Sequence, residues 1–396
     1  MLPPKYLLGY FSLVVGCGIL EDMNIREVIA IDVGTASLSM ALSKKGSSGN
    51  IEVVSVLRYP IDLFTSREEF DHRHRIPYLI KKNIAHGMAD AHKVLSGATA
   101  IVVSVSEPFF QQHRIRKIIA RKRSDDRVSR TEIDTMTENF SADAVTDTKK
   151  LSQLLRVVRS SIRRAWINGY ELIDPVGYRG EELEIELEVL LISAALCDYM
   201  EEFRSTWFPR ATIQYYTDPE MLGRILFESF SLLFPALLLD IGGEVTSITV
   251  VSDKETHAPC NLVFWGVRTI ERRIAELLRC DMAHAESFLR RYVSQTLDIR
   301  EISRIEPLLQ SVANDWLSLV AQSFHQTHAG ALHSIFIAGQ GRDISLFRHT
   351  IEQRITDFSS SPVELRELVV SPDRLLPPKI LSSGGDNVLA SLLLYT

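Results

Sequence analysis

The sequence predicts a mixed α/β fold built from two similar halves, and two observations lead to that prediction. Each half contains an acidic, glycine-containing turn, Asp32–Thr35 in the first half and Asp240–Gly243 in the second. Each turn follows a short apolar run and precedes an alternating run, which is the pattern of a strand, a turn and a second strand. The recurrence of this unit within one chain indicates an internal duplication.

The expected strands occupy corresponding places in the two halves. They cover residues 28–33, 37–42 and 51–57 in the first half, and residues 237–240, 245–251 and 261–265 in the second half. A single Asp-x-Gly turn between strands is common in proteins without any bound ligand. The prediction of a shared role for the two turns therefore depends on their repetition.

The residue types in the two turns suit a phosphate ligand. Glycines let backbone N–H groups approach phosphate oxygens, and an acidic side chain at a strand end can hold the water shell of Mg²⁺. We therefore predict that Asp32 and Asp240 contact Mg²⁺ through water. The neighbouring residues of the turns are expected to contact phosphate, and they are Gly34, Thr35, Ala36, Ser37, Gly242 and Gly243.

A third turn lies near the end of the second half. The apolar run 334–338 leads into Gly339, Gln340 and Gly341, and a helix with a regular apolar stripe follows from residue 343. A buried strand that runs into glycines and then into a helix allows a flat ligand such as adenine to approach the backbone. The alternative is an ordinary strand–turn–helix connection.

These three turns resemble the two phosphate motifs and the adenosine motif of the actin-like ATPases, and within them the bacterial cell-division protein FtsA. The resemblance covers residues 25–396. It implies a duplicated actin-like (ribonuclease H-like) fold that binds ATP and Mg²⁺ between its halves.

The middle of the chain resembles the SHS2 subdomain, a strand–helix–strand–strand insertion of FtsA. The expected parts are a strand at 100–106, a largely helical stretch at 131–164, a strand at 166–174, a turn at 175–180 and a closing strand at 183–190. In the last strand Leu and Glu alternate, so that one face is apolar and the other faces water. In FtsA this subdomain contributes to contacts between protomers and to partner binding, so the resemblance implies self-association through it.

The expected division of the chain follows from these assignments. It comprises an apolar N-terminal segment (1–24), the first part of an actin-like subdomain (25–99), the inserted SHS2 subdomain (100–195), a return to the first actin-like subdomain with a connecting helix (196–234), and the second actin-like half (235–396), whose small nucleotide-side subdomain covers about 268–330. A chain of 396 residues with 45% hydrophobic residues can bury cores in two or more such domains.

Three positions depart from the family pattern. Glu244 stands where the second phosphate motif usually has a third glycine, and Gln340 replaces a second glycine in the adenosine motif. A carboxylate near phosphate would weaken binding unless Glu244 points away or helps to hold Mg²⁺. On the helix that contacts the ribose or base, Glu286 is present, Leu289 takes the place of the usual lysine, and Arg290 follows one residue later. We expect ATP binding with at most slow hydrolysis.

The segment between the halves offers two candidates for positioning the attacking water. Asp218 and Glu220 begin a helix with apolar residues at helical spacing, and the resemblance implies that this connection can carry such a residue. The alternative role of Asp218 is helix capping, because Asp before Pro-Glu is a good N-terminal signal.

Composition excludes several other classes of function. The net charge of −6 and the pI near 6.0 give no reason to expect nucleic acid. The one basic stretch, 114–123, contains no aromatic residue, and we interpret it as a solvated edge that could alternatively touch anionic lipid or an acidic partner. The four cysteines are scattered, and the histidines show no zinc spacing, so we expect a reducing compartment and no structural metal.

Both ends of the chain bear on membrane attachment. The apolar run 7–20 is too short to span a bilayer comfortably. It is a signal-like or anchoring segment, a short membrane-associating helix, or an untranslated stretch before a start at Met23, and we favour the last because export would place an ATP site where ATP is scarce. The segment 384–396 resembles the helix that closes the actin-like core, and we expect no FtsA-type membrane helix after it.

Three functions remain open at this point. The first is an FtsA-like division protein that binds ATP, self-associates and links a tubulin-like ring (FtsZ) to the membrane. The second is a PilM-like cytoplasmic scaffold of type IV pilus assembly, recruited by a peptide of a membrane protein. The third is a small-molecule kinase of the same fold. For the first two we expect a cytoplasmic protein, peripheral at the inner face of the cell membrane, whose own membrane contact is indirect or made through the N-terminal segment.

Overall fold

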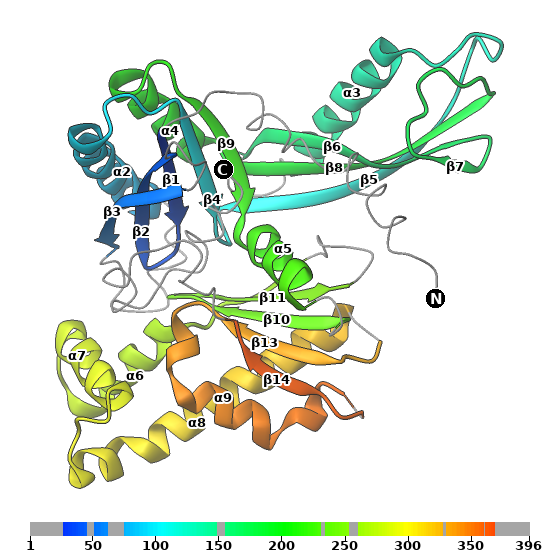
Figure 1. The fold of residues 1–396 in the computed structure, drawn as a ribbon. Coiled ribbons are helices and arrows are strands. Elements are labelled where there is room, and N and C mark those ends of the chain that lie inside the picture. Colours follow the sequence, from blue (N-terminus) through cyan, green and yellow to red (C-terminus); the bar gives the residue numbers. More distant parts are fainter. Residues whose placement is uncertain are drawn as a thin grey trace. The chain divides into compact units, whose positions relative to one another are not determined.

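The computed structural model describes residues 27–45, 51–61, 75–148, 155–230, 234–252, 260–327, 330–359 and 361–368. These residues divide into two compact units (Figure 1). One unit, called the inserted unit below, is Phe109–Glu202, and the other combines the described residues of Arg26–Pro108 and Phe203–Thr396. The apolar segment 1–24, the proposed start at Met23 and the closing segment 384–396 lie outside the described residues.

The larger unit contains two sheets of five strands with the same topology. Their orders are β3-β2-β1-β4-β9 and β12-β11-β10-β13-β14, and in both sheets the first three strands are antiparallel and the last two are added in parallel. The first sheet consists of β1 (Glu27–Val33), β2 (Ser37–Lys45), β3 (Ile51–Pro60), β4 (Ala100–Val105) and β9 (Thr212–Thr217). The second consists of β10 (Ala236–Ile241), β11 (Thr246–Val251), β12 (Cys260–Val263), β13 (Ser334–Ala338) and β14 (Glu364–Glu367). The predicted duplication is therefore confirmed.

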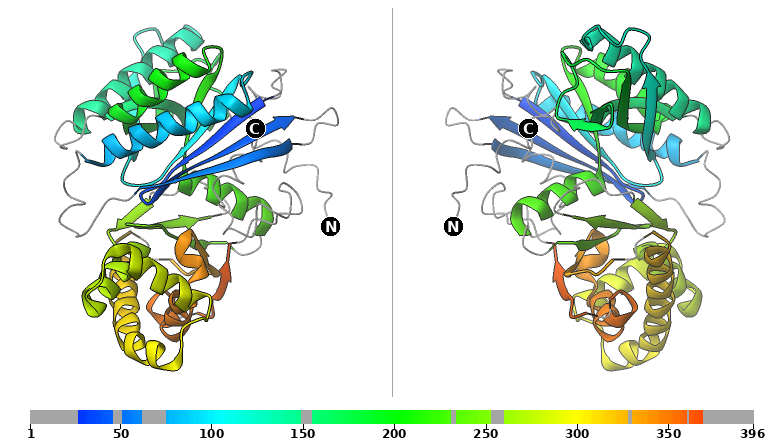
Figure 2. Two further views of the ribbon diagram at one scale, coloured as in Figure 1. Left: turned by 90° about the vertical axis from the view of Figure 1, so that its left-hand side faces the viewer. Right: turned by 90° about the vertical axis from the view of Figure 1, so that its right-hand side faces the viewer.

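Helices cover these sheets and contribute their apolar faces to the cores. They are α2 (Arg75–Val94), α5 (Asp218–Phe230), α6 (Val267–Leu278), α7 (Met282–Val293), α8 (Ile299–Thr327) and α9 (Ser345–Gln353), with the short turns η4 (Gln340–Asp343) and η5 (Ile355–Asp357). Helices α6 to α9 gather on one side of the second sheet (Figure 2). There the Trp316 and Phe347 rings lie 4.6 Å apart, and the Trp316 indole N–H donates to Thr246 Oγ1 at 3.0 Å.

The inserted unit is a four-stranded antiparallel sheet with one long helix against it. Its elements are β5 (Phe110–Ala120), α3 (Arg130–Thr148), β6 (Leu155–Ile167), β7 (Tyr170–Leu172) and β8 (Glu182–Ser193), and the sheet order is β5-β8-β6-β7. Helix α4 (Ala194–Trp207) leads back toward the larger unit. On β8, Leu183, Ile185 and Leu187 are buried in the core with α3, and Glu184 and Glu186 are partly exposed, as the alternation predicts. The alternation does not extend to Glu188, which is buried and pairs with Arg163 at 3.7 Å.

Three expectations for this region were wrong. Residues 100–106 do not begin the inserted sheet, because β4 pairs with β1 and β9, and its six residues are buried as in a central parallel strand. The described helix is Arg130–Thr148, and residues 155–164 belong to the strand β6 rather than to a helix. The stretch 166–174 is the end of β6, a turn and β7, with left-handed backbone at Asn168 and Gly169 as in an Asn-Gly hairpin turn.

The basic stretch 114–123 lies mainly on β5, an edge strand of the inserted sheet. Arg116 forms an ion pair with Glu184 and stacks over Trp166 at 4.5 Å, and Lys117 pairs with Asp143. These contacts fit the interpretation of a solvated charged edge for Arg116 and Lys117, but not for Arg121, whose side chain is buried and pairs with Glu132 at 2.8 Å. In the part of the chain that the structure describes, no helix has the length and apolar character needed to cross a membrane.

Candidate functional site

The two acidic turns have the same backbone geometry. The Gly34 N–H donates to the Ser37 carbonyl at 3.1 Å, and the Gly242 N–H donates to the Val245 carbonyl at 2.9 Å. At each glycine a Cβ atom would stand 3.2 Å from that same carbonyl oxygen. Asp32 lies opposite Ser39 and Asp240 lies opposite Ser247 in their hairpins. The turns are therefore structural copies as well as sequence copies.

The two turns touch each other. A Cβ atom on Gly243 would lie 2.2 Å from the Cβ of Ala36, so only glycine allows this approach. The Glu244 N–H donates to the Thr35 hydroxyl at 3.1 Å, and both residues are buried. Ser247 in turn donates to the buried Glu107 carboxylate of the first half. These contacts between the turns therefore join the two halves of the fold.

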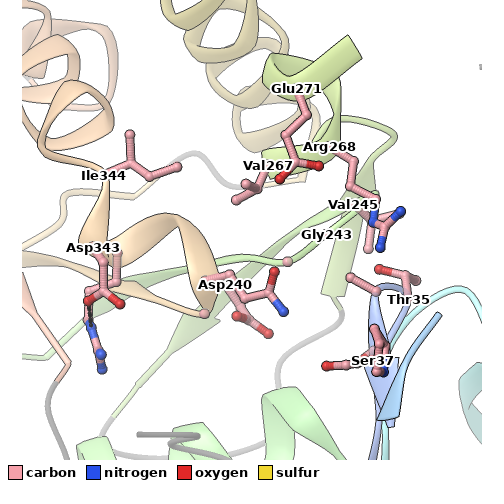
Figure 3. Close-up of a pocket in the computed structure, with 18 of the residues that line it drawn as sticks. Thr35, Ser37, Asp240, Gly243, Val245, Val267, Arg268, Glu271, Asp343 and Ile344 are labelled. Carbon is pink, nitrogen blue, oxygen red and sulfur yellow. Dashed lines mark hydrogen bonds and ion pairs between the residues drawn. The ribbon is translucent and has the colours of Figure 1, made fainter. Parts of the chain in front are cut away.

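A cavity of about 590 Å³ is lined by all three predicted turns (Figure 3). Most of the predicted site residues line it, namely Asp32, Gly34, Thr35, Ala36, Ser37, Asp218, Asp240, Gly242, Gly243, Glu286, Arg290, Gly339 and Gln340. Glu220 and Gly341 are not among the lining residues. For the residues that do line the cavity, contact with a nucleotide stays a prediction.

The two glycines of the third turn do different things. Gly339 has a φ of 76°, and a Cβ atom there would lie 2.3 Å from Asp240 Oδ1 and 2.6 Å from the Ile241 carbonyl oxygen. A Cβ atom on Gly341 would lie 2.4 Å from the Ile241 side chain, and the residue is buried. Gly339 thus brings the turn close to Asp240 at the cavity, whereas Gly341 permits packing against β10.

Glu244 points away from the cavity. Its carboxylate accepts two hydrogen bonds from the Arg272 guanidinium, at 3.1 and 2.7 Å, and both side chains are buried. Arg272 belongs to α6, whose first turn also donates from Val267 N–H to the Gly242 carbonyl at 3.0 Å. Of the two alternatives at Glu244, the structure supports the first, and the carboxylate ties the second turn to α6.

The three expected residues of the nucleotide-side helix α7 lie in two environments, the exposed surface and the core. Glu286 and Arg290 are exposed at the cavity and form an ion pair of 2.7 Å. Leu289, in the place of the usual lysine, is 4% exposed and belongs to the core while still lining the cavity. An exposed ion pair of this kind contributes little to the free energy of folding, so a ligand can form a contact with Glu286 or Arg290 in place of the pair.

Asp218 and Glu220 have separate environments. The Asp218 carboxylate lines the cavity and accepts from the hydroxyls of Ser104 and Ser106. Helix α5 is capped by Thr217, whose hydroxyl accepts from the Glu220 N–H at 3.3 Å, so the capping role expected of Asp218 was wrong. Glu220 is buried and pairs with Arg224 at 3.0 Å. Positioning of water stays a prediction, and of the two residues only Asp218 lines the cavity.

Direct metal ligation has no support in the described residues, where no group of three or more His, Cys, Asp or Glu side chains could hold a metal ion. The prediction for Asp32 and Asp240 concerns contact with Mg²⁺ through water. The two aspartates occupy equivalent positions in the two turns and both line the cavity.

Five charged residues that line the cavity are not among the predicted site residues, namely Arg58, Arg268, Glu271, Arg342 and Asp343. In the first sheet, Asp32 on β1 lies opposite Ser39 on β2, and Ser39 lies opposite Arg58 on the edge strand β3. Arg268 is anchored on the second turn by its N–H, which donates to the Gly243 carbonyl at 2.9 Å. Burial raises the pKa of Glu271 to about 7, the nearby Glu286 and Glu244 act in the same direction, and Arg268 and Arg272 oppose it.

No family model matches the chain, and no curated protein matches it. Solved structures do match. The PilM component of a PilM-PilN type IV pilus biogenesis complex is 15% identical, with 93% of this chain and 98% of that chain covered and a TM-score of 0.60. A Bacteroides thetaiotaomicron protein of actin-like ATPase fold and unknown function is 8% identical, with 93% and 96% covered and a TM-score of 0.46. The ethanolamine utilization protein EutJ from Carboxydothermus hydrogenoformans is 10% identical, with 87% and 86% covered and a TM-score of 0.43. The first of these likenesses, together with the duplicated sheet topology, shows that the chain has the actin-like ATPase fold.

Proposed function

We propose that the chain is an ATP-binding scaffold protein that assembles with protein partners. The observation that carries the proposal is the pair of equivalent Asp-x-Gly turns, which meet at one cavity together with the glycine turn at Gly339. Two such turns present backbone and carboxylate groups to the same small volume, which is the arrangement that a phosphate chain with Mg²⁺ requires.

The residues present fit this ligand. Gly243 and Gly339 hold backbone at approaches that a Cβ atom would block. The cavity lining carries six carboxylates and four arginines, so a polyphosphate would bring further negative charge into an acidic site unless Mg²⁺ accompanied it. Asp32 and Asp240 would hold the hydrated ion, and the ion would neutralise the phosphate oxygens. Glu286 and Arg290 would contact the ribose or base, beside the apolar Leu289 and Ile344 side chains.

The inserted unit favours a scaffold over a kinase. The inserted unit is a separate compact unit with its own core, and we propose that it contributes to self-association. A kinase would need a general base beside an acceptor hydroxyl. Asp218 is the candidate, but its carboxylate already accepts from Ser104 and Ser106. Transfer of phosphate from ATP to a small acceptor would overturn the scaffold proposal.

Two cellular roles fit an ATP-binding scaffold of this fold. In the FtsA-like role, the protein links an FtsZ-like division ring to the membrane. In the PilM-like role, it is recruited by a peptide of an inner-membrane pilus protein, and the likeness to the PilM structure over 93% of this chain supports that role. In both roles we propose a cytoplasmic protein at the inner face of the membrane, with no nucleic acid partner. Co-sedimentation with FtsZ polymers would support the FtsA-like role, and binding of a peptide from the pilus membrane protein would support the PilM-like role.

The test of nucleotide binding is ligand-dependent thermal stabilisation of the full chain by Mg²⁺-ATP. We expect stabilisation of the native sequence and of Asp134→Ala, a control on the exposed face of α3 in the inserted unit. Asp240→Ala should fold and lose the response. An unchanged response in Asp240→Ala would contradict the assignment of the site, and no response in the native protein would contradict ATP binding altogether.

A further inference from the structure

Two arginines that line the cavity have no hydrogen-bond or ion-pair partner among the described residues, although Arg268 lies close enough to Glu271 to lower its pKa. Within the described residues, the guanidinium groups of Arg58 and Arg268 form no hydrogen bond or ion pair, although both residues line the cavity. The other two arginines of the lining differ, because Arg290 pairs with Glu286 at 2.7 Å and Arg342 pairs with Asp343 at 3.1 Å. The cavity therefore holds two positive groups whose hydrogen-bonding capacity is not used by neighbouring side chains.

The two arginines come from opposite halves of the fold. Arg58 stands on β3 of the first sheet, opposite Ser39, which lies opposite Asp32. Arg268 stands on the first turn of α6, next to the second phosphate turn, and its side chain extends toward Thr35 (Figure 3). Because the turns touch through Ala36 and Gly243, an anion at their junction lies between the two halves that carry these side chains.

The chemistry of arginine suits a phosphate chain. The guanidinium is always charged, and its planar fork can donate two parallel hydrogen bonds to a phosphate group. Backbone N–H groups of the turns are neutral donors, so hydrogen bonds from them to a phosphate would not offset the acidic lining of the cavity. Arg58 and Arg268 supply positive charge at that place, in addition to Mg²⁺.

We propose that Arg58 and Arg268 bind the polyphosphate chain of the ligand from the two sides of the cavity and thereby select nucleoside triphosphate over nucleoside. The proposal rests on the proposed nucleotide-binding function and adds the two residues that bind the phosphate groups. It also makes the ligand a bridge between the halves, since each half contributes one of the two cations.

The test compares ligands that differ only in phosphate content. Equilibrium binding of Mg²⁺-ATP, adenosine and Mg²⁺-tripolyphosphate is measured by calorimetry for the full chain and for Arg58→Gln, Arg268→Gln and the double variant. Arg273→Gln is the matched control, because Arg273 lies on the same helix, is exposed and pairs with Glu276 at 3.1 Å. The melting temperature of each unliganded variant shows whether it folds.

Each single variant should weaken ATP and tripolyphosphate binding by about 10- to 100-fold, as expected for a hydrogen bond to a charged group, and leave adenosine binding unchanged. The double variant should differ from the product of the single effects, because both side chains hold one ligand. Equal losses for ATP and adenosine, or losses as large in Arg273→Gln, would overturn the proposal.

The tripolyphosphate measurement separates this proposal from the proposed function. If the native protein binds neither ATP nor adenosine but binds tripolyphosphate through the two arginines, nucleotide binding fails and the phosphate site stands. If ATP binds both arginine variants with native affinity, the proposed role of the two arginines is wrong and nucleotide binding is supported. If tripolyphosphate and ATP both fail to bind the native chain, both proposals are wrong.

Discussion

Glu271 allows a quantitative prediction about pH and stability. The residue lines the cavity on α6, and within the described residues its carboxylate forms no hydrogen bond or ion pair. Burial raises its pKa from 4.5 to about 7, assisted by Glu286 and Glu244 and opposed by Arg268 and Arg272. At pH values above 7 the folded protein therefore holds a charged group where burial favours the neutral form.

The sign of the effect follows from the two pKa values. Because the pKa is higher in the folded state than in the unfolded state, the folded state binds the proton more tightly. The resulting stabilisation is fully present below about pH 4.5 and is lost as the pH rises through about 7. The difference between the two pKa values corresponds to at most about 3 kcal/mol of unfolding free energy.

The perturbation is Glu271→Gln, which keeps the shape of the side chain and removes its titration. The free energy of unfolding is measured by urea denaturation between about pH 5 and about pH 8.5 for the native protein, for this variant and for Glu276→Gln. Glu276 is the control because it lies on the same helix, is exposed and pairs only weakly with Arg273.

Titrating groups that do not interact with Glu271 contribute equally to the native protein and the variant, so the difference between the two curves reports Glu271 together with the groups coupled to it. The stability of Glu271→Gln relative to the native protein should rise with pH and level off above about pH 7, after a total change of up to about 3 kcal/mol. Glu276→Gln should run parallel to the native curve. A Glu271→Gln curve that also runs parallel to the native curve would refute the assignment of a raised pKa to this residue.

Three further predictions concern the turns and their ligand. Arg272→Met leaves the buried Glu244 carboxylate unpaired and should lower the unfolding free energy by about 3 to 5 kcal/mol in urea denaturation, with part of the loss recovered when Glu244→Gln is added. Gly243→Ala places a methyl group against Ala36 and should abolish thermal stabilisation by Mg²⁺-ATP, and Ala36→Gly should restore part of it if that clash is the cause. Chelation of Mg²⁺ by EDTA should remove the ATP response in the same assay, because the cavity lining holds more carboxylates than arginines; a response that persists would argue against a bound ion.

The duplicated sheets could be predicted because their signals are local. An apolar run, an Asp-x-Gly turn and an alternating run specify a hairpin within about twenty residues, and the same signals occur in both halves. The copied hydrogen bonds at Gly34 and Gly242 show that the similarity extends to the backbone. The third turn followed the same logic, since Gly339 does adopt a positive φ.

The inserted unit is harder to delimit because its strands pair over long distances. β4 is apolar almost throughout, and such a run fits either sheet until its neighbours are known. β6 has arginine and serine between apolar residues and two irregularities in its pairing with β8, so its alternation is interrupted and its sequence can be mistaken for the continuation of a helix. The strand order that places β8 between β5 and β6 cannot be obtained from any local pattern.

The charged residues of the cavity show most clearly why motif comparison is incomplete. Glu244 and Leu289 look like losses when they are compared with the family pattern, since one adds a carboxylate and the other removes a cation. In the structure Glu244 is neutralised by Arg272, 28 positions away, and Leu289 belongs to the core while lining the cavity. Positive charge enters instead from Arg58 and Arg268, on a strand and a helix outside the three motifs. A departure within a motif therefore does not by itself indicate a decayed site, because the electrostatics of a cavity depend on every element that lines it.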